Sequence, residues 1–266
     1  MIIFDFNFLN SFISDNLDNK KRQAIDYCKI NQGEIGYLRS ILKKASYLHD
    51  VVILRNLIIS DEDQLKFLVE HIFKKNIFRS ERKNMPEIET FQVEPFLVPT
   101  WKTLSETSKS GGFHTDFWLS ERPPEFIMLH CIDADPKHPY YGRNQYVSAS
   151  SIFYKFKALF GQIELEKFIH HDFKYLNNIT AKFIDNQKTI RYHESLIDPE
   201  CKYSYELSVI LREISLSECS DFVLNKNDIA IFNNINGLHR RGEASIKFSL
   251  TLCQYESRNL NTLRFN

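Results

Sequence analysis

The feature that most constrains this fold is a series of short apolar segments, separated by turn residues, that begins near Ile88. Short runs rich in β-branched and aromatic residues between turns are typical of strands. One interruption, at about 152–176, carries apolar and charged residues at helical period. The pattern predicts a mainly antiparallel β-core with one helical insert. The predicted strand segments are FQVEPFLVP, FIMLHCIDA, YVSAS, KTIRYHE, DFVL, DIAIFNN and KFSLTLCQY.

The first part of the chain has a different pattern. Apolar residues at helical spacing between Lys20 and Tyr47 predict two helices that are interrupted near Gly33. The apolar run 51–54 then reads as a buried strand, and a helix follows with Ser60 as its expected N-cap.

Nothing in the sequence divides the chain into separate units, because it contains no long Pro/Gly/Ser linker, repeat or low-complexity tract. We therefore expect one domain over 1–266, with a helical region at 1–50 and a β-core at 51–266. The expected class is α+β, with a jelly roll or related barrel and flanking helices.

The composition limits the kinds of partner that the protein is expected to bind. The 34 Lys and Arg residues balance the 34 Asp and Glu residues, so no basic footprint for nucleic acid is present. No apolar run is long enough to cross a bilayer, and the N-terminus lacks the features of a secretory signal. The five scattered cysteines form no C-x-x-C pair and are expected to be reduced thiols of a cytoplasmic protein. We expect a small-molecule partner, and the sequence does not specify an oligomeric state.

One short motif combines an imidazole and a carboxylate. His114 and Asp116 are separated by one residue and follow Gly111 and Gly112, which are expected to allow a tight turn. In an extended stretch, residues i and i+2 point to the same face, so the two side chains would project together. The triplet is weak evidence alone, because composition predicts about one such triplet by chance, and a second one ends at Asp172.

A second motif lies far downstream, in DIAIFNNINGLHRR. A predicted strand at 229–232 runs into a turn, and His239 lies at the exit of that turn. Two histidines and one carboxylate leave one face of an octahedral ion open, which suits iron(II) when other ligands must bind the same ion. His130 and His193, which lie in strand-like segments, are expected to be hydrogen-bonded structural histidines.

Together these segments resemble the taurine-dioxygenase/clavaminate-synthase-like group of iron(II)- and 2-oxoglutarate-dependent oxygenases. The resemblance runs in order through VVILRNL, SDEDQLKFL, the His-x-Asp pair and DIAIFNNINGLHRR. It implies a double-stranded β-helix (jelly-roll or cupin-like) core, with His114, Asp116 and His239 as ligands of iron(II). It also implies 2-oxoglutarate as cosubstrate and dioxygen as oxidant.

The resemblance also implies residues for the distal carboxylate of 2-oxoglutarate. Where the family has an arginine at the start of the strand after the distal histidine, this chain has Lys247. A lysine keeps the charge but loses the two-pronged donor, so a helper donor is expected. Arg241 is the nearest candidate in sequence, and Gln145 takes the place of a family threonine.

The implied activity is hydroxylation of an unactivated C–H bond of a small polar molecule, expected to be an amino acid or a derivative, with release of succinate and CO2. Because Asp116 fills the position that is small in halogenating relatives, hydroxylation is expected rather than chlorination. Two alternatives remain open from the sequence. One is a non-catalytic cupin-like metal- or ligand-binding protein, and the other is a metal-dependent hydrolase or isomerase on the same barrel.

Overall fold

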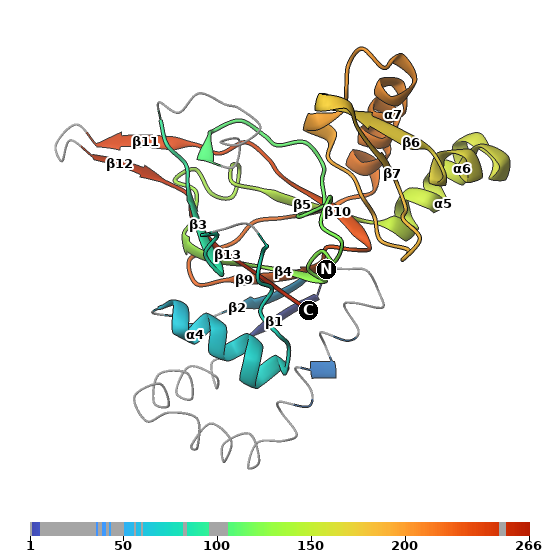
Figure 1. Cartoon of the computed structure of the whole chain (residues 1–266). Coiled ribbons are helices and arrows are strands. Elements are labelled where there is room, and N and C mark those ends of the chain that lie inside the picture. Colours follow the sequence, from blue (N-terminus) through green and yellow to red (C-terminus); the bar gives the residue numbers. More distant parts are fainter. Residues whose placement is uncertain are drawn as a thin grey trace.

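A six-stranded sheet forms the centre of the molecule (Figure 1). The computed structural model describes residues 2–5, 36, 39–40, 43, 51–55, 57–59, 61–81, 84–95, 106–249 and 254–266. Neighbouring strands of this sheet are antiparallel, except for the parallel pair at its edge, β1 and β2. In spatial order the strands are β1 (Ile2–Asp5), β2 (Val52–Arg55), β9 (Ile229–Asn233), β4 (Phe126–Asp133), β13 (Asn259–Phe265) and β3 (Ile88–Gln92).

A second antiparallel sheet packs against the inner face of the first one. Its strands, in order, are β10 (Gly237–Arg241), β5 (Asn144–Ser148) and β8 (Ser220–Phe222). Apolar side chains from both sheets form one cluster between them, which includes Tyr146 and Phe222 from the second sheet and Ala230 and Phe232 from β9. The uninterrupted apolar run of β9 follows from this packing, because both faces of the strand are buried.

The outer face of the large sheet is covered by a helix. It begins as α4 (Glu62–Phe67) and continues as the π-helical turn η1 (Leu68–Phe73), and its buried residues pack on Ile229 and Ile231 of β9. Its N-cap is Asp61, whose carboxylate accepts the backbone N–H of Gln64 at 2.9 Å, so the expected cap at Ser60 is wrong by one residue. Serine and aspartate are both good N-caps, so the backbone conformation at the start of the helix decides which of them caps it.

The helical insert differs from its predicted form. Helix α5 (Ala149–Phe160) ends at Gly161, whose φ of +86° favours glycine, and α6 (Gln162–Ile169) follows. The predicted helix at about 152–176 is therefore wrong beyond Ile169, because the chain then forms the hairpin of β6 (Asp172–Tyr175) and β7 (Ile179–Lys182). The remaining elements of this lobe are η3 (Leu176–Asn178), η4 (Glu194–Leu196) and the long helix α7 (Lys202–Glu218).

The last hairpin projects from the body of the molecule. Strands β11 (Ile246–Ser249) and β12 (Gln254–Ser257) pair with each other and reach outward from the sheets (Figure 1). The predicted strand segment KFSLTLCQY therefore contains the two arms of a hairpin, with residues 250–253 outside the described ranges.

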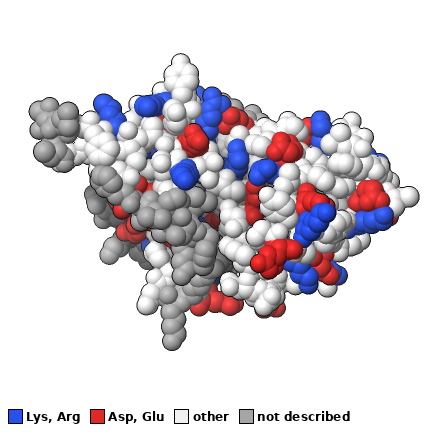
Figure 2. Space-filling view, turned by 90° about the horizontal axis from the view of Figure 1, so that it is seen from above, with Lys and Arg blue, Asp and Glu red and all other residues white. Residues whose placement is uncertain are grey.

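Most of the predicted N-terminal helical region lies outside the described residues, and so does most of the segment from Lys20 to Tyr47. Within 1–50, the described residues 2–5 form a strand, β1, and the described residues 36, 39, 40 and 43 are helical. Among the helices of the described ranges, none has both the length and the apolar character needed to span a membrane. Basic and acidic side chains are interspersed over the face seen in Figure 2.

Candidate metal centre and adjoining cavities

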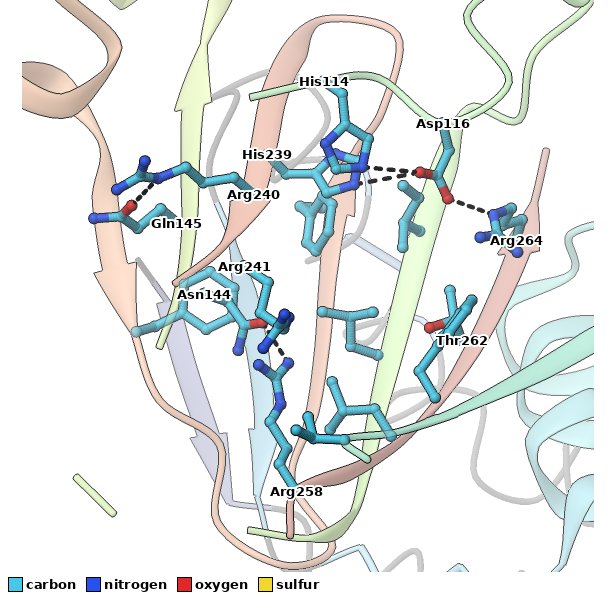
Figure 3. A pocket seen from close by; sticks show the side chains of 17 residues that line it. His114, Asp116, Asn144, Gln145, His239, Arg240, Arg241, Arg258, Thr262 and Arg264 are labelled. Carbon is cyan, nitrogen blue, oxygen red and sulfur yellow. Dashed lines mark hydrogen bonds and ion pairs between the residues drawn. The ribbon is translucent and has the colours of Figure 1, made fainter. Parts of the chain in front are cut away.

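Three side chains from distant parts of the sequence meet between the sheets. His114, Asp116 and His239 each offer a ligand atom, and these atoms lie within 4.8 Å of one another. The Oδ1 atom of Asp116 is 3.5 Å from Nε2 of His114 and 3.4 Å from Nε2 of His239 (Figure 3). This is the only such cluster of metal-ligating groups found among the described residues. The structure thus brings together the three residues singled out from the sequence.

The main chain fixes the two histidines relative to each other. The N–H of His114 donates to the carbonyl of His239, and the N–H of His239 donates back to the carbonyl of His114. On its other side, the segment of His114 pairs with residues 192–194, because Thr115 donates to Tyr192 and Glu194 donates to Phe113. His114 is therefore paired between two neighbouring segments, and Asp116 begins the turn that follows.

Gly112 is required by close packing rather than by a tight turn. Neither Gly111 nor Gly112 is among the glycines with positive φ. A Cβ atom at Gly112 would lie 2.8 Å from Oγ of Ser195 and 2.9 Å from Cβ of Glu194. The carbonyl of Gly112 also accepts a hydrogen bond from Nδ1 of His114 at 2.8 Å if that nitrogen carries the proton. This bond would leave Nε2, which faces Asp116, free as a metal ligand.

Asn234 anchors Asp116 through the backbone. Its Oδ1 accepts the N–H of Asp116 at 2.8 Å, and its Nδ2 donates to the carbonyls of Asp116 and Pro124 at 3.0 Å each. The asparagine is 1% exposed, so this amide has little access to water. The residue that follows the ligand, Phe117, has a φ of +55°, which is uncommon for an aromatic residue.

The side chain of Asp116 is held by a buried arginine. Nε of Arg264, on β13, donates to Oδ2 of Asp116 at 2.5 Å, and Nη1 of Arg264 donates to Oε2 of Glu89 at 2.5 Å (Figure 3). Burial alone would raise the pKa of Asp116, but the charge of Arg264 and the bonds to His114 and His239 hold it well below its usual range. The carboxylate is therefore ionised at neutral pH.

The two histidines titrate differently. Burial and the nearby charge of His114 lower the pKa of His239 to about 4, so His239 is neutral and able to bind a metal at pH 7. For His114, burial also opposes protonation, but the hydrogen bond and charge of Asp116 outweigh it and raise the pKa. A cation bound at Nε2 would take the place of that proton beside Asp116, since metal ligation requires the neutral imidazole.

A cavity of about 200 Å³ lies between the sheets beside the cluster. At its inner end, Arg258 and Arg241 lie close together beside Asn144, and Nη2 of Arg258 donates to Oδ1 of Asn144 at 2.6 Å (Figure 3). Arg258 is 4% exposed, and among the described residues no hydrogen-bond partner is found for its Nη1 or for Nδ2 of Asn144. Buried donors of this kind, on residues that line a cavity, suit an anionic ligand.

The charges in this cavity support the same conclusion. Burial, followed by the charge of Arg241, lowers the pKa of Arg258 to about 9. Burial lowers the pKa of Arg241 to about 10, and Nη2 of Arg241 donates to the carbonyls of Thr107 and Lys109. Two buried guanidinium groups disfavour each other's charge, and a carboxylate placed between them would relieve that cost.

The structure does not bring Lys247 to this cavity. Lys247 lies on the projecting hairpin, where its side chain is 64% exposed and Nζ is 3.1 Å from Oε2 of Glu256 on the paired strand. Gln145 lines the cavity, but its Oε1 accepts a hydrogen bond from Arg240, away from Arg258 (Figure 3). Neighbouring residues on a strand point to opposite faces, so Asn144, not Gln145, contacts Arg258.

A larger cavity of about 590 Å³ opens on the other side of His114 and Asp116. Its lining combines apolar and acidic side chains with His193, whose Nδ1 has no hydrogen-bond partner among the described residues. The hydrogen bond expected for His193 is thus not found at Nδ1. Burial and the charge of His114 lower the pKa of His193 to about 3. The apolar lining residues include Phe78, Met85, Phe117, Trp118, Leu119 and Leu196.

Sequence reasoning missed Arg258, Arg264 and Asn144. A signal for the two arginines was present in SRNLNTLRFN, where residues 260, 262 and 264 alternate on one face of β13 and Arg258, just before the strand, lines the same cavity. The resemblance to the family ended before this strand. Glu89 was missed because it contacts the centre only through Arg264.

The sequence from 36 to 194 matches the family model described as "Taurine catabolism dioxygenase TauD, TfdA family". A search of curated protein sequences gives no significant match.

Several solved structures share the fold. An asparagine oxygenase (AsnO) superposes with a TM-score of 0.66 at 15% identity, covering 85% of this chain and 77% of the other. PvcB, an Fe, alpha-ketoglutarate-dependent oxygenase from an isonitrile synthetic pathway, gives 0.60 at 18% identity, covering 85% and 79%. The non-heme iron oxygenase OrfP, in complex with Fe, succinate and (3S)-hydroxy-L-Arg, gives 0.65 at 10% identity, covering 100% and 94%.

Proposed function

The chain belongs to the TauD/TfdA family of iron(II)- and 2-oxoglutarate-dependent oxygenases, and from this premise we propose that it hydroxylates an amino acid or a derivative. The reaction would insert one oxygen atom into an unactivated C–H bond and release succinate and CO2. The observation that carries the proposal is the convergence of His114, Asp116 and His239 on one point between the sheets. Product complexes of AsnO with 2S,3S-3-hydroxyasparagine and of OrfP with (3S)-hydroxy-L-Arg support an amino-acid substrate.

The residues of the cluster fit iron(II). Nε2 of His114, Nε2 of His239 and Oδ1 of Asp116 would hold the ion, and both cavities adjoin these residues. When bound, the iron supplies the activation of dioxygen that couples decarboxylation of 2-oxoglutarate to oxidation of the substrate. The protein's contribution is to position both organic molecules and to exclude water.

We assign the smaller cavity to 2-oxoglutarate. Arg258 would bind its distal carboxylate with Nη1, while Arg241 lies beside it and Nδ2 of Asn144 is a further donor. Arg258 directly precedes strand β13, so it replaces Lys247 as the candidate for the family's strand-opening arginine. A buried guanidinium with a free N–H group binds a carboxylate far more strongly than an exposed lysine that already has an acidic partner.

We assign the larger cavity to the substrate. Glu81 and Glu89 would face the ammonium group of an amino acid, and the aromatic rings of Phe117 and Trp118 would pack against its apolar part. A volume of about 590 Å³ is large enough for an amino acid or a derivative of it.

Asp116 favours hydroxylation over chlorination, because its carboxylate would take the place at the metal that chloride would need. We therefore expect an oxygenated product, and no chlorinated one, when the enzyme turns over in the presence of chloride.

The two alternatives from the sequence are less well supported. A metal-dependent hydrolase or isomerase needs the metal cluster but no buried anion site beside it, and a non-catalytic metal- or ligand-binding protein needs no combination of the two. The neighbouring guanidinium groups of Arg258 and Arg241 in that cavity therefore favour the oxygenase.

We assign the two facing sheets to a double-stranded β-helix within a single domain. The thiols of Cys131, Cys201 and Cys219 are free, which supports a reducing, cytoplasmic setting. The described residues on the face in Figure 2 have basic and acidic side chains interspersed, which supports a small-molecule partner.

The test has two stages. Anaerobic addition of iron(II) and 2-oxoglutarate should produce the weak visible charge-transfer band of the chelate. Aerobic incubation with a panel of amino acids should then increase succinate release and add one oxygen atom to the accepted substrate. His239→Ala is the control and should abolish both signals. A wild-type protein that binds metal but shows no band with 2-oxoglutarate would contradict the proposal.

A further inference from the structure

We infer that Arg264 is a positioning residue for the metal centre, because it holds one oxygen of the Asp116 carboxylate so that the other faces the two histidines. The inference rests on the proposed metal site and extends it to a residue that does not itself bind the metal.

The two oxygens of Asp116 have different partners. Oδ1 faces Nε2 of both histidines, whereas Oδ2 accepts the Nε–H of Arg264 at 2.5 Å. A free carboxylate could present either oxygen, or both, to a metal ion. Because Arg264 occupies Oδ2, Oδ1 is the oxygen available to a metal and binding through one oxygen is favoured.

Arg264 is itself held from two further sides. Its Nη1 donates to Glu89 on β3, and its guanidinium lies over the ring of Phe117 at 5.3 Å. Glu89 is paired across the strands with Thr262, so Glu89 and Arg264 are diagonal neighbours on one face of the sheet. The side chain of Arg264 is 10% exposed, which leaves it little freedom to adopt another position.

A second role for Arg264 must be distinguished from this one. It lines the larger cavity, so it could bind the carboxylate of an amino-acid substrate. Two of its N–H groups are already directed to Asp116 and Glu89, which favours the positioning role. The two roles predict different results, because a substrate receptor should affect the substrate KM and leave metal affinity intact.

Electrostatics and positioning predict opposite changes in metal affinity when Arg264 is replaced. Removing a cation near the site, as in Arg264→Met, should by electrostatics alone strengthen the binding of a divalent ion. Loss of positioning predicts the opposite, a 10- to 100-fold weaker binding, on the order seen for partners that orient metal ligands. The double variant Glu89→Gln/Arg264→Met removes both charges of a neutral pair, so its effect reports orientation with little change in net charge.

The measurement is a titration with Co(II) by calorimetry and visible absorption, which needs no turnover. We expect weaker binding and an altered Co(II) spectrum for both variants, with an intermediate effect for Arg264→Lys. Thr262→Val, on the same face of β13, is the matched control and should stay within twofold of wild type. Thermal melting checks folding, and Arg264→Lys serves as the test if the methionine variants do not fold.

The outcomes separate the inference from the proposed function. If wild-type protein does not bind Co(II), the proposed metal site itself fails. If wild-type protein binds Co(II) and the Arg264 variants bind it with unchanged affinity and spectrum, the positioning role is overturned. A raised substrate KM with unchanged Co(II) binding would assign Arg264 to the substrate instead.

Discussion

His114 and His239 exchange both of their backbone hydrogen bonds, with N···O distances of 2.9 Å and 3.0 Å. The relative position of the two imidazole groups is thus set by the main chain, and the packing of either ring has less influence on it. Any change that displaces β10 from the segment of His114 should therefore disturb the metal centre, even if it leaves all three ligands in place.

Gly237, the first residue of β10, provides such a change. A Cβ atom there would lie 2.4 Å from the hydroxyl oxygen of Tyr146. Tyr146 is 1% exposed and lies opposite His239 in the strand pairing. We expect Gly237→Ala to destabilise the protein by about 1–3 kcal/mol, as overpacking does, and to weaken Co(II) binding. Urea unfolding and calorimetry measure the two effects.

A second substitution should relieve that clash. Tyr146→Leu in the Gly237→Ala background removes the contacting ring atoms and should restore part of the Co(II) affinity. Gly242→Ala is the control just beyond the other end of β10, where the nearest atom to the new Cβ is 3.4 Å away. Equal losses for Ala at 237 and 242 would contradict the steric explanation.

Asn234 should be important for stability as well as for the site. Asn234→Ala removes three hydrogen bonds and leaves buried backbone groups of Asp116 without partners. We expect a loss of about 2–4 kcal/mol in the free energy of unfolding, because unsatisfied buried groups cost more than the bonds contribute. Asn236→Ala, in the same turn, should cost less than about 1 kcal/mol. Urea denaturation of the metal-free protein measures both, and similar values would contradict the prediction.

Arg258 and Lys247 offer a direct comparison for cosubstrate binding. Arg258→Gln should raise the 2-oxoglutarate concentration needed for half-maximal charge-transfer absorption by about 10- to 100-fold, the range expected for a charged hydrogen bond. Co(II) affinity should not change. Lys247→Gln should leave the 2-oxoglutarate requirement within about twofold, because an exposed ion pair contributes little. A large effect at Lys247 and none at Arg258 would restore the assignment made from the sequence.

His130 should make stability depend on pH. It lies on β4, is 4% exposed, and neither ring nitrogen has a partner among the described residues, so the expected hydrogen bonding is not found. Burial lowers its pKa to about 4. The unfolded chain therefore binds more protons than the folded one between about pH 6.5 and pH 4, and stability falls as pH decreases through this window.

The size of this effect is on the order of a few kcal/mol at the acidic end. His130→Phe should flatten the pH dependence of the free energy of unfolding relative to wild type, measured in urea at pH 7 and pH 5. Both proteins are measured without metal, so that the other buried histidines contribute equally. Parallel curves for the two proteins would contradict the prediction.

The family, the metal and the cosubstrate were predictable from the sequence, and the family match supports them. They were predictable because the chemistry is concentrated in local motifs, His-x-Asp and the segment around His239. Helix α7 was missed for the opposite reason. Its buried face includes Ser204, Ser208 and Ser215, which weakens the apolar periodicity that identifies a helix.

Alternation along an extended strand is a local property, so the sequence alone could predict that His114 and Asp116 project together if their stretch is extended. The sequence alone could not determine which cationic side chain faces the distal carboxylate of 2-oxoglutarate. That choice depends on the path of the chain after His239. The hairpin of β11 and β12 carries Lys247 into solvent, and the chain returns between the sheets at Arg258. Non-local strand pairing made that choice, and the same pairing placed Arg264 against Asp116.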